Sequence, residues 1–320
     1  MKKKLEGLTE DISIFDFLEQ NFRDKNDVNF KNSILKMVEG YDAADPKLIS
    51  TFVLRDEWLS KPSLTQIIND HRIKEGYGAL FDFLEDECKR LGVEIRLNTH
   101  VKIINYTPAG VTIQTDKETL KALKVIITVP LPILKEIEFK PEISDKIALT
   151  EKIGFGNAIK LLIKFKTRWW EKATKHDLSK MAFILCNGKF MTWWTQYPEI
   201  NTILTGWMAG PEAFKYKEAS NEQLLELALD SLSQVLKIDK AFIAEQIITS
   251  KSFNWPSDPF TKGAYSYTTI HTKDAYERLA EPVENVIFFA GEALYSGEVT
   301  ATVEGAFGSG LETARLILNT

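Results

Sequence analysis

Hydrophobic residues along the chain fall into patterns that are typical of buried β-strands. Residues 125–130 and 286–290 are nearly continuous apolar runs, as expected for strands that are buried on both faces. Residues 93–97, 101–106 and 111–115 are shorter strand-like segments, and a Pro-Ala-Gly sequence predicts the turn between the last two. These patterns predict a meander of three short strands next to buried strands.

Helical spacing of apolar residues dominates other parts of the chain. Residues 8–72 are predicted to be mostly helical. A further helix should follow Gly76 and stop at Gly92, because glycine readily adopts the left-handed conformation that is common just after a helix. Ser220 and Gln223 have the spacing of a capping box and predict the start of another helix. Helices that alternate with buried strands indicate the α/β class.

A second group of strands is predicted in the middle of the chain. Three tryptophans at positions 193, 194 and 207 fall among them. They would either line a substrate cavity or form plain core, and aromatic residues in strands are more often core. The predicted strands are residues 159–165, 181–186, 190–195 and 202–208.

Composition and charge restrict the classes of function. The chain has 320 residues, a net charge of −5 and 44% hydrophobic residues, which is enough for one large core or two domains. Mild acidity argues against nucleic acid as the main partner. No apolar run approaches membrane-spanning length, and the N-terminus lacks an apolar signal segment. We therefore expect a cytoplasmic protein with neither a nucleic-acid nor a membrane partner.

No metal site is expected from the potential ligand residues. Cys88 and Cys186 have no metal-ligand spacing, lie in apolar contexts and are expected to be inert core residues. The four histidines are scattered.

The most informative stretch begins at the end of the buried strand 286–290. Gly291 lets the backbone leave this strand sharply, and Glu292 then lies at the carboxyl end, where ligands of open α/β sheets bind. Thr302 is a candidate N-cap for a helix whose first-turn N–H groups would carry partial positive charge. Ala306, Gly310 and Ala314 form a stripe of small side chains that would let this helix lie close to something flat. The alternative is an ordinary buried strand and a helix that tolerates glycine.

These residues resemble the C-terminal segment of the flavin-containing amine oxidases, the monoamine and polyamine oxidase superfamily. The resemblance extends to the Gly-Tyr-Gly helix, the meander and the strand that ends in Thr-Val-Pro. It implies an α/β fold in which a Rossmann-like FAD-binding domain is interleaved with an α+β substrate domain. The implied substrate domain comprises residues 1–72, its helical part, and 149–256; the implied FAD-binding domain comprises residues 73–148 and 257–320.

The resemblance also implies site residues. Glu292 would contact the ribose or ribityl part of FAD, and the amides of Thr302 and Val303 would face the flavin pyrimidine edge. Val101 would meet the adenine through its backbone. Trp255 marks the return of the chain to the FAD-binding domain, and Tyr265 would be the aromatic residue of the cage beside the flavin. Gly291 completes the set of cofactor-binding residues.

Lys160 enters a strand that should be largely buried, and a buried lysine is costly unless it has a partner or a task. In the family that the chain resembles, a lysine at this spacing from a glycine, here Gly156, holds a water against flavin N5. The alternative is an exposed strand residue that shares its face with Lys164.

Two residues depart from the family pattern. Ala264 occupies the position where some members bond covalently to the flavin through a cysteine, so FAD would be noncovalent. Thr302 occupies the position of the second cage tyrosine, which places a simple amine substrate in doubt.

A larger departure is an absence. No Gly-x-Gly-x-x-Gly opens a βαβ unit, although the family carries that phosphate-binding unit ahead of the segments seen here. A truncated gene product, a downstream start or a split gene, with a separate N-terminal dinucleotide-binding chain as partner, would each explain this absence.

The expected function is FAD-dependent oxidation of a small-molecule amine. The family chemistry is hydride transfer from the carbon next to nitrogen to flavin N5, followed by reoxidation by oxygen. The alternative is a noncatalytic, truncated homologue that acts as a subunit or a binding module.

Overall fold

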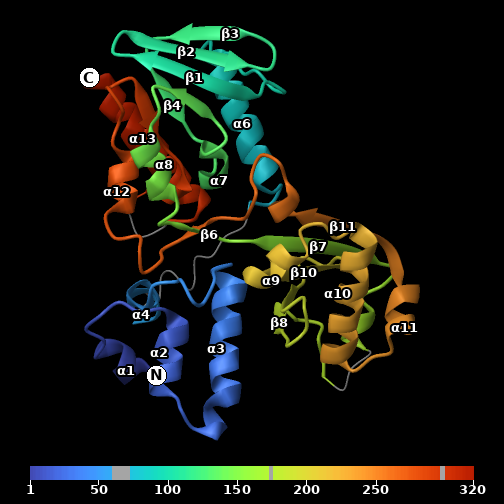
Figure 1. Ribbon diagram of the computed structural model, residues 1–320. Coiled ribbons are helices and arrows are strands. Elements are labelled where there is room, and N and C mark those ends of the chain that lie inside the picture. Colours follow the sequence, from blue (N-terminus) through green and yellow to red (C-terminus); the bar gives the residue numbers. More distant parts are fainter. Residues whose placement is uncertain (60–72, 173–175, 296–299) are drawn as a thin grey trace.

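The computed structural model describes residues 1–59, 73–172, 176–295 and 300–320, which form two lobes (Figure 1). The upper lobe contains the described parts of residues 73–153 and 264–320. The lower lobe contains residues 1–59 and the described parts of 154–263, so the chain passes from one lobe to the other three times. The N-terminal elements of the lower lobe are α1 (Lys2–Glu6), α2 (Ile14–Asn21), η1 (Lys25–Asp27), α3 (Val28–Tyr41) and α4 (Thr51–Leu59).

A five-stranded antiparallel sheet forms the rest of the lower lobe, in the order β11-β7-β10-β9-β8. One face packs against α10, whose N-terminus has the predicted capping box between Ser220 and Gln223. Trp170 and Trp193 are fully buried in this core. The elements are β6 (Gly154–Phe155), β7 (Ala158–Phe165), η2 (Trp169–Glu171), β8 (Phe183–Leu185), β9 (Thr192–Trp194), β10 (Ile203–Ala209), α9 (Pro211–Lys215), α10 (Asn221–Leu236), α11 (Lys240–Glu245), β11 (Ile247–Asn254) and η3 (Trp255–Ser257).

The upper lobe contains a four-stranded sheet, β3-β2-β1-β5, and a parallel pair, β13-β4. β13 is buried on both faces as predicted, because its apolar run packs in the upper core. The elements are α6 (Tyr77–Arg90), β1 (Val101–Thr107), β2 (Gly110–Thr115), β3 (Thr119–Ala122), β4 (Val125–Ile127), α7 (Leu131–Leu134), β5 (Glu138–Lys140), α8 (Ser144–Thr150), β12 (Ser266–Tyr267), α12 (Ala275–Ala280), β13 (Ile287–Phe289), η4 (Glu292–Leu294) and α13 (Val303–Leu318).

Four sequence expectations are wrong, and three of them concern the upper lobe alone. Residues 93–97 form no strand, because no described strand lies beside them to complete a ladder. The strand predicted at 125–130 is only three residues long, and its central residue, Ile126, is exposed on one face. α6 forms and ends before Gly92 as predicted, but none of its residues is buried. Cys88, on α6, and Cys186 are only partly buried rather than core residues.

The lobes join through a tight crossing of backbone near β6. β6 pairs with β12, and Gly156 exchanges hydrogen bonds with the 264–265 backbone. A Cβ on Gly156 would lie 2.8 Å from the Cβ of Ala43, so only glycine fits where the α3–α4 link touches this crossing. The crossing therefore holds residues 41–45, 154–160 and 264–267 next to one another. Within the described ranges, no helix has the length and apolar character that a bilayer crossing requires.

Candidate functional site

Glu292 begins η4, shortly after the end of β13. Ser266, in β12 at the crossing between the lobes, anchors its side chain. Its carboxylate accepts hydrogen bonds from the backbone N–H of Ser266, at 3.1 Å, and from its hydroxyl, at 2.7 Å. The backbone N–H of Ala301 is a further donor. Burial raises the pKa of Glu292, while these donors act in the opposite direction. The structure thus places Glu292 next to the segment that carries Tyr265, with its carboxylate already held by protein donors.

The N-terminus of α13 has the predicted cap. The Thr302 hydroxyl accepts a hydrogen bond from the N–H of Gly305 at 3.0 Å. The stripe that packs inward is Gly305, Ser309 and Thr313, one position before the predicted small stripe. The hydroxyls of Ser309 and Thr313 bond to the N–H of Gly291 and to the carbonyl of Phe289, so they close the outer edge of β13.

The predicted stripe of Ala306, Gly310 and Ala314 is left partly or fully exposed. A Cβ on Gly310, or on Gly291, would meet no heavy atom within 4 Å. Open glycines at a strand end and on a helix are suited to the close approach of a ligand or of another backbone. The contact that the small side chains predict is therefore absent from the described residues.

Lys160 lies on the face of β7 that is opposite the lower core. Trp207 and Phe253 are its direct partners on the two neighbouring strands, so both share its face. Its Nζ lies 5.9 Å from the ring centroid of Trp194, within reach of a cation–π interaction. Burial lowers the pKa of Lys160, and no carboxylate of the described chain pairs with it.

Lys160 was interpreted either as a largely buried lysine or as an exposed residue that shares its face with Lys164. The exposure of the two lysines can now be compared. Lys164 shares the face of Lys160 but is exposed, whereas Lys160 is half-buried among aromatic rings. The three tryptophans lie on different faces of the sheet. Trp193 is in the lower core, whereas Trp194 and Trp207 lie on the Lys160 face. Sequence alone could not assign these faces.

Tyr265 packs with Ala264 and Trp207 against a small cluster of buried alanines at the crossing. Its hydroxyl donates a hydrogen bond to the carbonyl of Tyr41 at 2.6 Å. Burial, and then the Asp42 carboxylate, raise the pKa of Tyr265. The Trp207 indole N–H also reaches this link, because it donates to the carbonyl of Gly40 at 2.8 Å.

Asp42 is a further candidate site residue, which the sequence alone did not indicate. Burial, and then the Glu57 carboxylate, raise the pKa of Asp42 to about 7. It caps the C-terminus of α3, where the helix dipole adds negative potential. In the sequence, Asp42 stands between a tyrosine and two alanines. The structure shows that both alanines are buried.

Trp255 and Val101 are the remaining predicted residues. The Trp255 ring is partly exposed and lies nearly parallel to Phe253, with centroids 6.5 Å apart, so it belongs to the Lys160 side of the lower sheet. Val101 begins β1, opposite Thr115, and packs against the upper core. No described contact joins it to the other predicted residues.

The arrangement fits the ring and sugar parts of FAD. Gly291 and Gly310 have open space where a Cβ would be, and the exposed Val303 begins α13. Partly exposed aromatic rings lie on the Lys160 face, and a helix N-terminus suits electron-rich groups. A dinucleotide also needs a phosphate cradle, and the chain contains no glycine-rich loop that opens a βαβ unit. The residues present would therefore hold FAD through its flavin and ribityl end.

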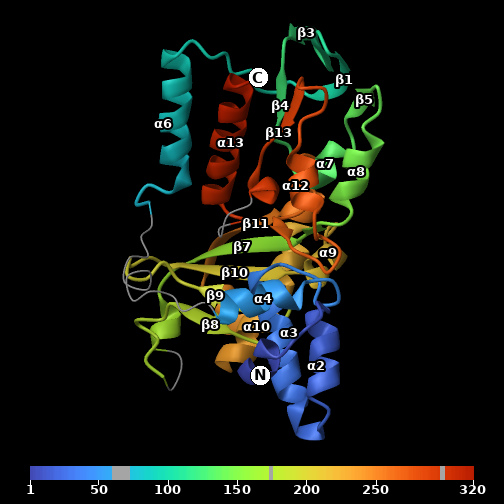
Figure 2. The ribbon, with the colours of Figure 1, turned by 90° about the vertical axis from the view of Figure 1, so that its left-hand side faces the viewer.

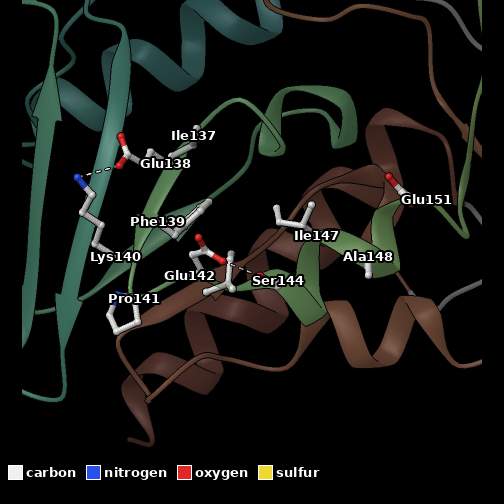
Figure 3. Close-up of a pocket in the computed structure, with 11 residues that line it drawn as sticks. Ile137, Glu138, Phe139, Lys140, Pro141, Glu142, Ser144, Ile147, Ala148 and Glu151 are labelled. Carbon is white, nitrogen blue, oxygen red and sulfur yellow. Dashed lines mark hydrogen bonds and ion pairs between the residues drawn. The ribbon is translucent and has the colours of Figure 1, made fainter.

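A cavity lies away from these residues. It has a volume of about 630 Å³ and is formed by β5, α8 and the link between them (Figure 3). Its floor is apolar, with Phe139 and Ile147, and its rim carries Glu142 and the ion pair of Lys140 with Glu138. None of the predicted site residues lines it.

Comparison with known proteins identifies relatives along the whole chain. The sequence profile described as flavin containing amine oxidoreductase matches residues 2–318. The chain is 30% identical over 233 residues to lysine-specific histone demethylase 1 homolog 1 of Oryza sativa subsp. japonica, covering 71% of this chain and 27% of that protein. It is 26% identical over 276 residues to lysine-specific histone demethylase 2 of Homo sapiens, covering 81% and 32%. The chain thus spans about a third or less of these relatives.

A solved structure shows the same fold. Putrescine oxidase, in a wild-type form bound to putrescine, superposes with a TM-score of 0.77 at 19% identity, over 97% of this chain and 68% of that chain. At this identity the likeness shows the fold alone, which is the Rossmann-like fold of FAD-dependent amine oxidases.

Proposed function

Because the chain belongs to the family of flavin containing amine oxidoreductases, we propose that it takes part in FAD-dependent oxidation of an amine. The match to this family over residues 2–318 is the observation that carries the proposal. When bound, flavin supplies the hydride acceptor for a carbon next to nitrogen and passes the electrons on to oxygen. The chain itself supplies binding, orientation and charge around the reacting atoms.

FAD would be held at the end of β13. Glu292 has a lone pair left after its bonds to Ser266 and Ala301, and this lone pair would accept a sugar hydroxyl. The first amides of α13, at Thr302 and Val303, would face electron-rich carbonyls of the ring. Ala264 offers no nucleophile, which supports noncovalent binding.

Lys160 and Asp42 would supply charge on two sides of the substrate. Lys160 would hold a water molecule through its ammonium, which the neighbouring rings of Trp194 and Trp207 partly shield from solvent. Asp42, at the negative end of α3 and close to Tyr265, would attract the cationic end of an amine when it is ionised, which its raised pKa of about 7 restricts to neutral and higher pH. The names of the relatives suggest a methylated lysine side chain or a diamine as substrate.

A noncatalytic binding module is the second candidate. It is favoured by the lack of a glycine-rich phosphate loop in the sequence and by the protein donors that already occupy Glu292. Such a module would keep the fold and would hold FAD or a protein partner without reducing the flavin.

One experiment separates the two candidates. The purified chain is mixed with FAD, alone and with a dinucleotide-binding segment added in trans, and the visible absorption of flavin is followed anaerobically. Loss of the flavin bands on addition of putrescine or a methylated-lysine peptide, with peroxide released on admitting air, supports oxidation. Bound flavin that no amine reduces would leave the binding module as the better account.

A further inference from the structure

A second, smaller cavity lies at the crossing between the lobes. It has a volume of about 230 Å³, and none of the predicted site residues lines it. Its walls come from the α3–α4 link, β6, β12 and α9, and α9 lies near the crossing in both ribbon views (Figure 1, Figure 2). The lining includes Asp45, Leu48, Pro211 and three aromatic residues. The candidate flavin site makes no use of this space.

The three aromatic rings come from three different elements. They are Phe155 in β6, Phe214 in α9 and Tyr267 in β12. A Cβ on Gly263 would lie 2.5 Å from the ring of Phe155, and a Cβ on Gly154 would lie 2.3 Å from the ring of Tyr267. Such close packing against backbone holds these two rings in place. Phe214, by contrast, is 51% exposed, so the cavity can be reached from solvent.

Asp45 gives the cavity a negative charge. Among the described residues that line the cavity, it alone is charged. One of its carboxylate oxygens accepts a hydrogen bond from the backbone N–H of Lys47 at 2.9 Å. The ammonium of Lys47 lies elsewhere, 5.4 Å from the ring centroid of Phe15. The carboxylate therefore keeps lone pairs and a charge for a cation in the cavity.

A carboxylate beside aromatic rings suits an organic cation better than a metal ion. Rings attract cations through their negative faces. A Ca²⁺ ion needs about six to eight oxygen ligands, whereas the described part of the chain has no cluster of acidic, histidine and cysteine residues that could hold a metal. A primary ammonium is compact and strongly hydrated, so moving it among rings and apolar side chains is costly. Methyl groups on the nitrogen lower this cost, because they can contact the rings, Leu48 and Pro211.

The ring of Phe214 already attracts an ammonium group. The Nζ of Lys217 lies 4.9 Å from its centroid, within the range of a cation–π interaction. Lys217 does not line the cavity, so its ammonium leaves the interior free.

We propose that this cavity binds a methylated ammonium group, with the three rings around its methyl groups and Asp45 opposite its charge. Pockets for drug-sized molecules measure about 300–1,000 Å³, so a volume of about 230 Å³ suits a head group and its first carbons. Two sources carry such a group, a methylated lysine side chain of a protein and a free quaternary amine such as choline. The proposal concerns binding and does not depend on whether the chain oxidises amines.

The test uses two matched pairs of probes with the full chain. The first pair is choline and the neutral alcohol in which carbon replaces its nitrogen. The second pair is a short peptide with one trimethyllysine and the same peptide with unmodified lysine. Ligand NMR titrations give the dissociation constants. We expect the methylated cation of a pair to bind about 10-fold or more tightly than its partner. Binding of the peptide alone would assign the source to a protein side chain, and binding of choline would assign it to a free amine.

Two variants locate the site. Phe214→Ala removes an exposed ring, and Asp45→Asn removes the charge but keeps an acceptor for the N–H of Lys47, so both should fold. Phe242→Ala, which removes an exposed phenylalanine of α11 outside the cavity, is the control. We expect each of the first two to weaken binding about fivefold or more and the control to leave it unchanged. The proposal is overturned if neither methylated cation binds, if each binds no better than its partner, if binding survives either cavity variant, or if the control weakens it equally.

Discussion

Asp42→Asn should change the pH dependence of folding stability in a defined direction. The Asp42 side chain is partly buried between α3, α4 and Tyr265, and its own N–H closes α3 through the carbonyl of Val38 at 3.0 Å. Loss of hydration disfavours its charged form first, and the Glu57 carboxylate adds repulsion. The result is a rise in the pKa of Asp42 from 3.8 to about 7.

The sign follows from the protons that each state binds. Between pH of about 4 and 7, folded Asp42 holds a proton that the unfolded chain has released, so the free energy of unfolding falls as pH rises through this window. A shift of about three units corresponds to about 4 kcal/mol at high pH. About 2–3 kcal/mol of this loss falls between pH of about 5 and 8.

Asparagine has the same shape but no charge to desolvate. The variant should therefore gain about 2–3 kcal/mol relative to the parent between pH of about 5 and 8. Urea unfolding of both proteins at the two pH values measures this difference. Asp86→Asn, which removes an exposed carboxylate from α6, controls for the change in net charge. Parallel stability profiles of Asp42→Asn and parent would refute the reasoning.

Three further predictions concern the flavin site. The chain alone should bind FAD weakly, because its sequence has no phosphate loop, and FAD that stays with the chain in stoichiometric amount through gel filtration would contradict this. Glu292→Ala should destabilise the fold by about 1–3 kcal/mol in urea unfolding, since Ser266 loses its acceptor, and should weaken FAD binding about 10-fold or more once a dinucleotide-binding segment is supplied; an unchanged FAD titration would remove Glu292 from the site. In the same reconstituted protein, Lys160→Met should keep FAD binding but slow reoxidation by oxygen about 100-fold or more in stopped-flow measurements, because a half-buried ammonium is lost. Reoxidation at the parent rate would make Lys160 a structural residue.

Elements whose signals are local could be predicted from the sequence. The Ser220–Gln223 capping box, the Thr302 cap and the glycine after α6 each form as expected, because their partners lie within a few residues. The apolar run that becomes β13 was also predicted correctly, since its residues are buried on both faces of the strand.

Elements that depend on distant neighbours were predicted less well. A strand needs a partner, and residues 93–97 have the pattern of a strand without a described neighbour to pair with. The contact predicted for the stripe of small residues on α13 was wrong for the same reason. Ala306 and Gly310 predict a close contact, but β13 is reached through Ser309 and Thr313, because their hydroxyls satisfy the backbone groups at its edge.

The candidate site illustrates why strand faces limit what a sequence can say about chemistry. Alternation placed Lys160 and Lys164 on one face, yet it could not say which of them faces aromatic rings, since this depends on the register of β7 with β10 and β11. That register puts Trp207 and Phe253 on either side of Lys160, while Lys164 remains in solvent. Two lysines with the same local pattern therefore differ in burial and in their possible roles. Burial lowers the pKa of Lys160 because its ammonium is costly there, and this cost is the physical basis for proposing that the charge acts on a bound molecule.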